Sequence, residues 1–355
     1  MNIKMRYLPQ GTLPYESVEP ATKMMTKLFE KIPYCPFFTK IPSDENLITA
    51  SLRKIPGISV SGKKIDFNPT AANFNVAMTK LDKAFAHPKK ELLAPYAMQS
   101  IFSEKFFSII KKHESPYAII NLIGPYTLAQ LLKNFAEEQI ITDKNLRKLI
   151  IQAVSVKALA TIERIKEASS KTQPIVILEE YLLGGLGTLK RENEEVTSEL
   201  VTSILTRVIE KIKESGAIVA VRCNEKCDWQ VAINAGVDII AFDAYNNPNN
   251  LSIFPEQVTD FLKRGGKIAW GIIPTTSESI IKNLDNETIF KRLIATMNGL
   301  VESGVPIKLV YNSAIVSTLG DTGHLSIIFA EKVLMMTAQI ARRIPIIKDE
   351  VPSES

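Results

Sequence analysis

The sequence lacks several features that would place the chain in a specialised class of protein. It has 3 cysteines among 355 residues, an odd number that is too small for a disulfide framework and that indicates a reducing compartment. Its apolar runs are far shorter than a membrane span. The first ten residues, MNIKMRYLPQ, contain neither the apolar core nor the cleavage site of a signal peptide. We therefore expect a cytoplasmic protein that has no membrane partner.

A strong charge of one sign is also missing. The 43 Lys and Arg residues nearly balance the 38 Asp and Glu residues, which leaves a net charge of +5. No basic block is interleaved with aromatic residues, so nucleic acid is not an expected partner. Apolar residues make up 45 % of the chain, as in ordinary globular proteins. The length suits two ordinary domains or one large barrel.

Short apolar, β-branched runs alternate with long amphipathic segments along the chain. This alternation predicts βαβ units and a parallel sheet in an α/β protein. The clearest strand candidates are residues 117–124, 174–180, 217–223, 237–243, 267–274 and 307–313. Two further runs, at 6–14 and 58–67, bring the number to eight, which favours a (β/α)₈ TIM barrel.

An open, doubly wound sheet is the competing architecture. It would need a Gly-rich phosphate turn after an early strand, and GGLG at 184–187 lacks both the required spacing and the ribose-binding acid. No linker rich in Pro, Gly or Ser divides the chain. We therefore predict one barrel domain over residues 1–345, with 32–70 as an N-terminal decoration at the barrel mouth. Residues 346–355 form a polar tail that we expect to be disordered.

Polar residues at the ends of the predicted strands are the candidate functional residues, because barrel enzymes hold their chemistry there. In AIVAVRC, Val219, Val221 and Cys223 share one face and Arg222 lies on the other. If the valine face meets the helices, Arg222 points into the barrel and Cys223 does not. The same parity turns Asp243 inward. We expect Arg222 and Asp243 to pair across adjacent strands, either at a catalytic site or as a plain barrel salt bridge.

Seven motifs follow one another in an order that resembles a known superfamily. They are GTLP (11–14), GPYTLA (124–129), LEEYL (178–182), CDW (227–229), VDIIAFDAY (237–245), WGIIPT (270–275) and a final helix, AEKVLMMTAQIARR (330–343). The series resembles the superfamily of cobalamin-independent methionine synthase and uroporphyrinogen decarboxylase. Within it, the chain is similar to short stand-alone proteins related to the catalytic half of the synthase. The resemblance covers nearly the whole chain and implies a TIM barrel.

In the synthase, the resemblance implies a zinc ion that holds a thiol as the more nucleophilic thiolate. The ligand pattern has a His and a Cys two residues apart at one strand end, and a second Cys at the last strand end. Here Arg222 and Asn224 stand at the first two positions, and the last loop, 311–324, has no cysteine. Arg has no lone pair for a metal, and Asn is a poor zinc ligand. We therefore expect no metal, and Cys223 and Cys227 as the ligands if one binds.

The resemblance also implies which residues line the pocket. Gly11 and Thr12 match a loop that grips the substrate, and Glu179 and Glu180 match acids that bind a substrate ammonium group. For these two acids, helix capping and salt bridging remain the alternatives. The other candidates are Trp229 and Ser313 for substrate binding, and His324, with Arg222 and Asp243, for catalysis.

These observations leave three functions open. The first is methyl transfer to a small thiol or related nucleophile, without the usual zinc, from a donor such as a methylated folate or methylcobalamin. A corrinoid protein would be a possible partner. The second is a metal-free lyase similar to uroporphyrinogen decarboxylase, although the Arg-rich N-terminal signature of that enzyme is absent. The third is a barrel that binds a ligand or a partner without catalysis.

Overall fold

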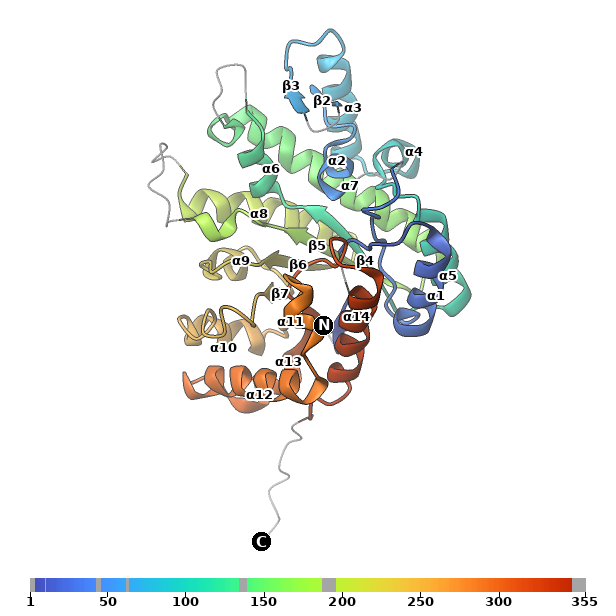
Figure 1. Cartoon of the computed structure of the whole chain (residues 1–355). Coiled ribbons are helices and arrows are strands. Elements are labelled where there is room, and N and C mark those ends of the chain that lie inside the picture. Colours follow the sequence, from blue (N-terminus) through green and yellow to red (C-terminus); the bar gives the residue numbers. More distant parts are fainter. Residues whose placement is uncertain are drawn as a thin grey trace.

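The main sheet of the protein is parallel and curled. The computed structural model describes residues 4–9, 11–42, 46–61, 64–133, 139–186 and 196–346 (Figure 1). In these residues the sheet has the strand order β1-β9-β8-β7-β6-β5-β4, and all neighbouring strands are parallel. The strands are β1 (Tyr7–Leu8), β4 (Tyr117–Ile123), β5 (Gln173–Glu179), β6 (Ile218–Cys223), β7 (Ile239–Phe242), β8 (Lys267–Ile273) and β9 (Ala314–Thr318).

Residues 33–39 occupy the remaining barrel position, between β4 and the chain that follows β1. On one side, the Ile119 amide donates to the Pro33 carbonyl at 2.9 Å, and the Cys35 amide donates to the Ile119 carbonyl at 3.3 Å. On the other side, the Leu13 amide donates to the Phe37 carbonyl at 2.8 Å. This segment closes the curled sheet, so the chain has an α/β TIM-barrel-like fold, as the sequence predicts.

Helices surround the sheet, since the strands are buried on both faces and need cover on the outside (Figure 1). The helices of the barrel are α1 (Val18–Phe29), α5 (Ser103–His113), α6 (Pro125–Leu131), α7 (Lys144–Ala168), α8 (Ser198–Lys213), α9 (Gln230–Asn234), α10 (Pro255–Lys263), α11 (Glu278–Lys282), α12 (Asn286–Glu302), α13 (Ile307–Ser313) and α14 (Ile327–Ala341). An additional unit consists of α2 (Leu47–Leu52), β2 (Ile58–Ser61), β3 (Lys64–Phe67), α3 (Phe74–Ala86) and α4 (Lys90–Leu93). None of the helices in the described ranges is long and apolar enough to cross a membrane.

Two of the predicted barrel strands are wrong. Residues 58–67 form the antiparallel hairpin β2–β3, which is a separate sheet. Residues 307–313 form α13, and the strand β9 comes directly after it. Pro306, whose φ is −58°, stands directly before the helix and favours its start. The buried residues Val310 and Ser313 are three positions apart, with Tyr311 beside them, which is the spacing of one helix face. Residues 33–39, expected within the decoration, belong to the barrel wall.

A buried lysine joins the additional unit to the barrel. Lys157, on α7, is 3 % exposed, and its ammonium group donates to the Ala50 carbonyl at 3.3 Å and to the Arg53 carbonyl at the end of α2. The last carbonyls of a helix lack intrahelical donors as a rule, so a lysine that donates there caps the end of α2. Burial, together with nearby Arg53 and Lys54, lowers the pKa of Lys157 from 10.5 to about 7.

This lowered pKa predicts a stability that rises with pH. Between about pH 7 and 10.5 the unfolded chain binds more protons at Lys157 than the folded chain does, so the free energy of unfolding increases with pH in that window. We expect an increase of about 2 kcal/mol between pH 7 and pH 9. The variant Lys157→Met should lose this increase in urea titrations, whereas the exposed control Lys105→Met should keep it. Equal slopes in all three proteins would contradict the assignment.

Candidate functional site

A cavity of about 260 Å³ opens at the carboxyl ends of the barrel strands. This is the end at which TIM barrels hold their active sites. The strands β4, β5 and β6 contribute residues of their own to its wall, and the loops that follow β1, β5 and β9 contribute further residues. Residues 35–37 and the start of α2 complete the wall. The residues that line it are Gly11, Thr12, Cys35, Phe37, Asn46, Leu47, Ile48, Asn121, Ile123, Glu179, Tyr181, Arg222 and Asp321.

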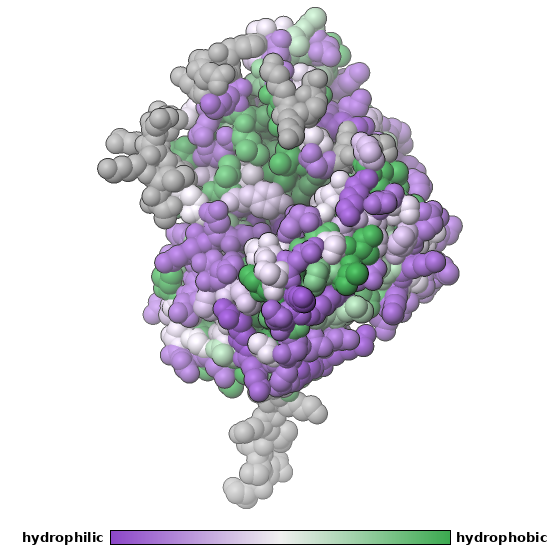
Figure 2. Space-filling view, viewed as in Figure 1, coloured by the Kyte–Doolittle hydropathy of each residue, from purple (hydrophilic) through white to green (hydrophobic). Residues whose placement is uncertain are grey.

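The face shown in Figure 2 is largely hydrophilic over the lower helices, and apolar residues gather below the β2–β3 hairpin.

Arg222 and Glu179 form an ion pair in the wall of this cavity. The Nε atom of Arg222 donates to Oε2 of Glu179 at 2.6 Å, and the two side chains are 4 % and 1 % exposed. Oε1 of Glu179 accepts from the Asn121 side-chain amide, also at 2.6 Å. The strand register places Arg222 beside Ala241, which pairs in turn with Ala269, so small residues share its face of the sheet. Arg222 therefore lines the cavity, as its parity in β6 predicts.

The expected pair between Arg222 and Asp243 is wrong. Glu179 is the register partner of Arg222 on β5 and receives its hydrogen bond instead. Asp243 accepts hydrogen bonds from the backbone and side-chain amides of Asn246, at 2.7 and 2.8 Å, and from the Asn247 side chain at 3.3 Å. These bonds hold the turn after β7. Asp243 is not among the residues that line the cavity.

Burial dominates the electrostatics of Glu179, whereas at Arg222 burial lowers the pKa and the charges of Glu179 and Tyr181 raise it above the usual value. Burial raises the pKa of Glu179 above the usual value, and the Arg222 charge and the hydrogen bonds from Asn121 and Arg222 act in the opposite direction. Burial also raises the pKa of the Tyr181 hydroxyl, and the nearby Glu179 carboxylate adds to this rise. The nearby positive charge of Arg222 acts the other way and lowers the pKa of Tyr181. Tyr181 is therefore a neutral donor and acceptor next to a buried ion pair.

Glu180, the second acid of LEEYL, caps a helix and does not line the cavity. Its carboxylate accepts hydrogen bonds from the Tyr126 amide at 3.0 Å and from the Thr127 amide and hydroxyl at 2.7 Å each. These donors belong to the first turn of α6, which Pro125 begins. Burial raises the pKa of Glu180 to about 7, and the bonds from Thr127 and Tyr126 oppose that rise. The helix-cap alternative for Glu180 is confirmed, whereas the expected contact with a substrate ammonium finds no support in the cavity wall.

The loop after β1 meets the loop after β9 at the cavity rim. The Thr12 hydroxyl donates to Oδ1 of Asp321 at 2.8 Å, and the Gly323 amide donates to the same oxygen at 3.2 Å. Gly11 has a φ of +94°, and a Cβ there would lie 2.5 Å from the Asp321 Cβ, so this close approach requires glycine. Gly11 and Thr12 lie in the cavity wall, where the resemblance puts them. Their role in substrate binding stays a prediction.

The remaining candidates lie outside the cavity wall. His324 is half exposed, lies 3.7 Å from Oδ1 of Asp321 and contacts the Thr275 carbonyl at 2.7 Å. Trp229 is fully buried and packs edge-on against Phe242, with ring centroids 6.5 Å apart. Ser313 ends α13 and bonds to the Val310 carbonyl at 2.9 Å. It stands before β9, at the opposite end of that strand from the cavity, so its expected place at a strand's carboxyl end is wrong.

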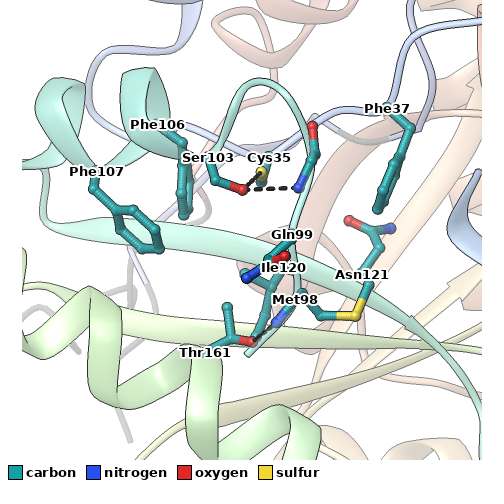
Figure 3. A pocket seen from close by; sticks show the side chains of 11 residues that line it. Cys35, Phe37, Met98, Gln99, Ser103, Phe106, Phe107, Ile120, Asn121 and Thr161 are labelled. Carbon is teal, nitrogen blue, oxygen red and sulfur yellow. Dashed lines mark hydrogen bonds between the residues drawn. The ribbon is translucent and has the colours of Figure 1, made fainter. Parts of the chain in front are cut away.

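A second, much smaller space adjoins the cavity behind residues 35–37 (Figure 3). The side chains of Met98, Phe106 and Phe107 form its apolar part, and Cys35, Phe37 and Asn121 line both spaces. Its volume is about 10 Å³, which is close to that of a single water molecule. Of these two adjoining spaces, only the larger has room for a ligand.

Comparisons with known proteins give a structural likeness and no sequence family. No protein-family model matches, and neither does any curated protein. A methyltransferase from Methanosarcina mazei superposes with a TM-score of 0.51 at 9 % identity, over 95 % of this chain and 94 % of that one. A Bacillus GH26 endo-β-1,4-mannanase gives a TM-score of 0.43 at 10 % identity, over 68 % and 70 % of the chains. The likeness to the methyltransferase supports the TIM-barrel fold. At such identities it shows the fold alone.

The residues at the expected zinc position do not fit a metal. Cys223 is fully buried on the other face of β6 from Arg222, and its thiol contacts the Glu225 carbonyl at 3.7 Å. A hydrogen bond from Cys227 lowers the pKa of Cys223, and burial raises that of Cys227. Across the described ranges, no three His, Cys, Asp or Glu residues stand together as metal ligands. Arg222 occupies the strand end where the resemblance places an imidazole.

Sequence reasoning missed four polar residues of the cavity: Asn46, which caps α2, and Asn121, Tyr181 and Asp321. Asn121 is an amide side chain within the apolar run YAIINLIG, and a polar residue in a buried strand indicates a polar partner or a site. Tyr181 follows the two acids of LEEYL, and Asp321 follows the true last strand, β9. The sequence pattern predicts the last strand at 307–313, seven residues before β9, so Asp321 does not follow a predicted strand end.

Proposed function

We propose that the protein transfers a methyl group to a small thiol or related nucleophile bound in the cavity, without a metal. The observation that carries this proposal is the set of ionisable groups around the cavity: Glu179, Arg222, Tyr181 and Asp321 come from three strand ends and converge on one space. The motif order and the methyltransferase-like barrel support the same reading. A cavity of 150 Å³ accepts benzene, so about 260 Å³ suits a molecule with the size of a small amino or thiol acid.

The reaction needs an acceptor for the thiol proton. The thiolate attacks the methyl carbon, the new S–C bond forms, and the bond between the methyl group and its donor breaks, with the electron pair leaving on the donor. Both oxygens of Glu179 accept hydrogen bonds from Asn121 and Arg222. Asp321 makes its contacts with Thr12, Gly323 and His324 through Oδ1. Asp321 is therefore the residue that we propose as the base, with His324 beside it.

The decarboxylase-like alternative fits the cavity less well. A tetrapyrrole carries many carboxylates, and the described wall offers one arginine, Arg222. Non-catalytic binding remains the outcome if no turnover is found.

The test is a methyl-transfer assay. Purified protein is incubated with a methylated folate or methylcobalamin and a panel of small thiols, and the S-methyl product is measured by mass spectrometry. We expect product from at least one pair, and a fall in kcat of about 100-fold for Asp321→Asn. The exposed control Asp260→Asn, on α10, should retain wild-type activity. No product from any pair of donor and thiol would contradict the proposal.

A further inference from the structure

Arg222 has hydrogen-bond donors that the described residues do not use. A guanidinium carries five N–H groups. Nε donates to Oε2 of Glu179 at 2.6 Å. Nη1 is buried and has no hydrogen-bond partner among the described residues. A buried donor without a partner costs about 1–3 kcal/mol, so an acceptor there would stabilise the protein.

Glu179 is not that acceptor in this structure, because its carboxylate receives Nε of Arg222 and leaves Nη1 without a partner. One of its oxygens accepts from Nε of Arg222 and the other from the Asn121 amide. The pair is therefore joined through Nε alone rather than as a two-bond fork, and Asn121 fixes the carboxylate from its other side. Glu179 and Asn121 are positioning residues that orient the guanidinium in the cavity wall.

The charge of the cavity wall restricts which chemical group can be the missing acceptor. The ionisable groups of the described wall include one cation, Arg222, and two carboxylates, Glu179 and Asp321. The wall already carries one more negative than positive charge, so a single carboxylate adds less repulsion there than a dianion such as phosphate does. Charge-assisted bonds from arginine to a carboxylate are also stronger than bonds to a neutral carbonyl.

We infer that the substrate of the proposed reaction is a small monocarboxylate, and that the Arg222 guanidinium is the receptor of its carboxylate group. This inference rests on the proposed function for the choice of site and adds the class of molecule that the site selects. The rest of the substrate then extends from Arg222 toward Thr12 and Asp321 at the rim of the cavity. A thiol acid fits both requirements.

Binding without turnover tests the inference. The dissociation constants of 3-mercaptopropionate, 3-mercaptopropionamide and inorganic phosphate are measured by titration calorimetry with no methyl donor present. The acid and the amide have the same shape and differ in charge. We expect the acid to bind at least about 10-fold more tightly than the amide, and phosphate to bind more weakly than the acid. Equal binding of acid and amide, tighter binding of phosphate, or no binding of either thiol compound would overturn the inference.

A variant that removes the whole ion pair identifies the receptor. Arg222→Met alone leaves Glu179 buried without its partner, so the double variant Glu179→Gln, Arg222→Met is used. We expect its acid and amide dissociation constants to become equal. The exposed control Arg207→Met, on α8, should keep the 10-fold preference. A preference that survives in the double variant would overturn the role of Arg222. Because no methyl donor is present, this result is independent of whether methyl transfer occurs.

Discussion

The variant Arg222→Met should lower the free energy of unfolding by about 3–5 kcal/mol. Arg222 and Glu179 are 4 % and 1 % exposed, and removing the guanidinium leaves the Glu179 carboxylate buried with only the Asn121 bond. Breaking a buried pair on one side costs much more than replacing the whole pair. Urea unfolding at pH 7, followed by tryptophan fluorescence and circular dichroism, measures the change.

The double variant Glu179→Gln, Arg222→Met supplies the comparison. A glutamine can keep an oxygen acceptor for the Asn121 amide and carries no charge. We expect this double variant to recover at least half of the stability that Arg222→Met loses. The exposed change Arg207→Met should cost less than about 0.5 kcal/mol. If the double variant is less stable than Arg222→Met, the pair is stabilising by itself, and the explanation by an isolated buried charge fails.

The alternation of apolar runs and helices was sufficient to predict the barrel and the inward direction of Arg222. Alternation in a strand fixes which face each residue occupies. It does not fix which neighbour a side chain reaches, because β6 lies between β5 and β7 and both carry an acid at the end. Glu179 stands in register with Arg222, whereas Asp243 is held by Asn246. The partner of Arg222 therefore depended on register, which the sequence pattern leaves open.

Two other parts of the barrel were not predictable from periodicity. Residues 33–39 close the sheet with only a few backbone hydrogen bonds, and they contain Pro33 and Pro36, which do not indicate a strand. The apolar stretch 307–318 is longer than one strand, and its first part became α13 because the pattern of a short apolar run is shared by helices and strands. Because of this ambiguity, the predicted strand ended at Ser313, and Asp321, which follows the true strand β9, was not among the predicted site residues.

The variant Glu180→Ala should lower the free energy of unfolding by about 3 kcal/mol. The Glu180 carboxylate is fully buried and accepts three hydrogen bonds from Tyr126 and Thr127. Its removal leaves two amide donors of the first turn of α6 buried without acceptors and opens a small cavity. Glu180→Gln should cost less, because its amide oxygen still accepts while its NH₂ group faces donors. Thermal unfolding at pH 8 measures both changes.

Glycine at position 124 gives an independent check of the same contact. A Cβ on Gly124 would lie 2.2 Å from the Glu180 carboxyl, so Gly124→Ala must displace that carboxyl from the helix start. We expect Gly124→Ala to destabilise the wild type but to cost far less in the Glu180→Ala background, where the space is free. Glu256→Gln, in the exposed first turn of α10, should leave stability unchanged. Additive effects of the two alanine changes would mean that Glu180 does not hold α6 through this contact. The second acid of LEEYL would then again be a candidate for contact with the substrate.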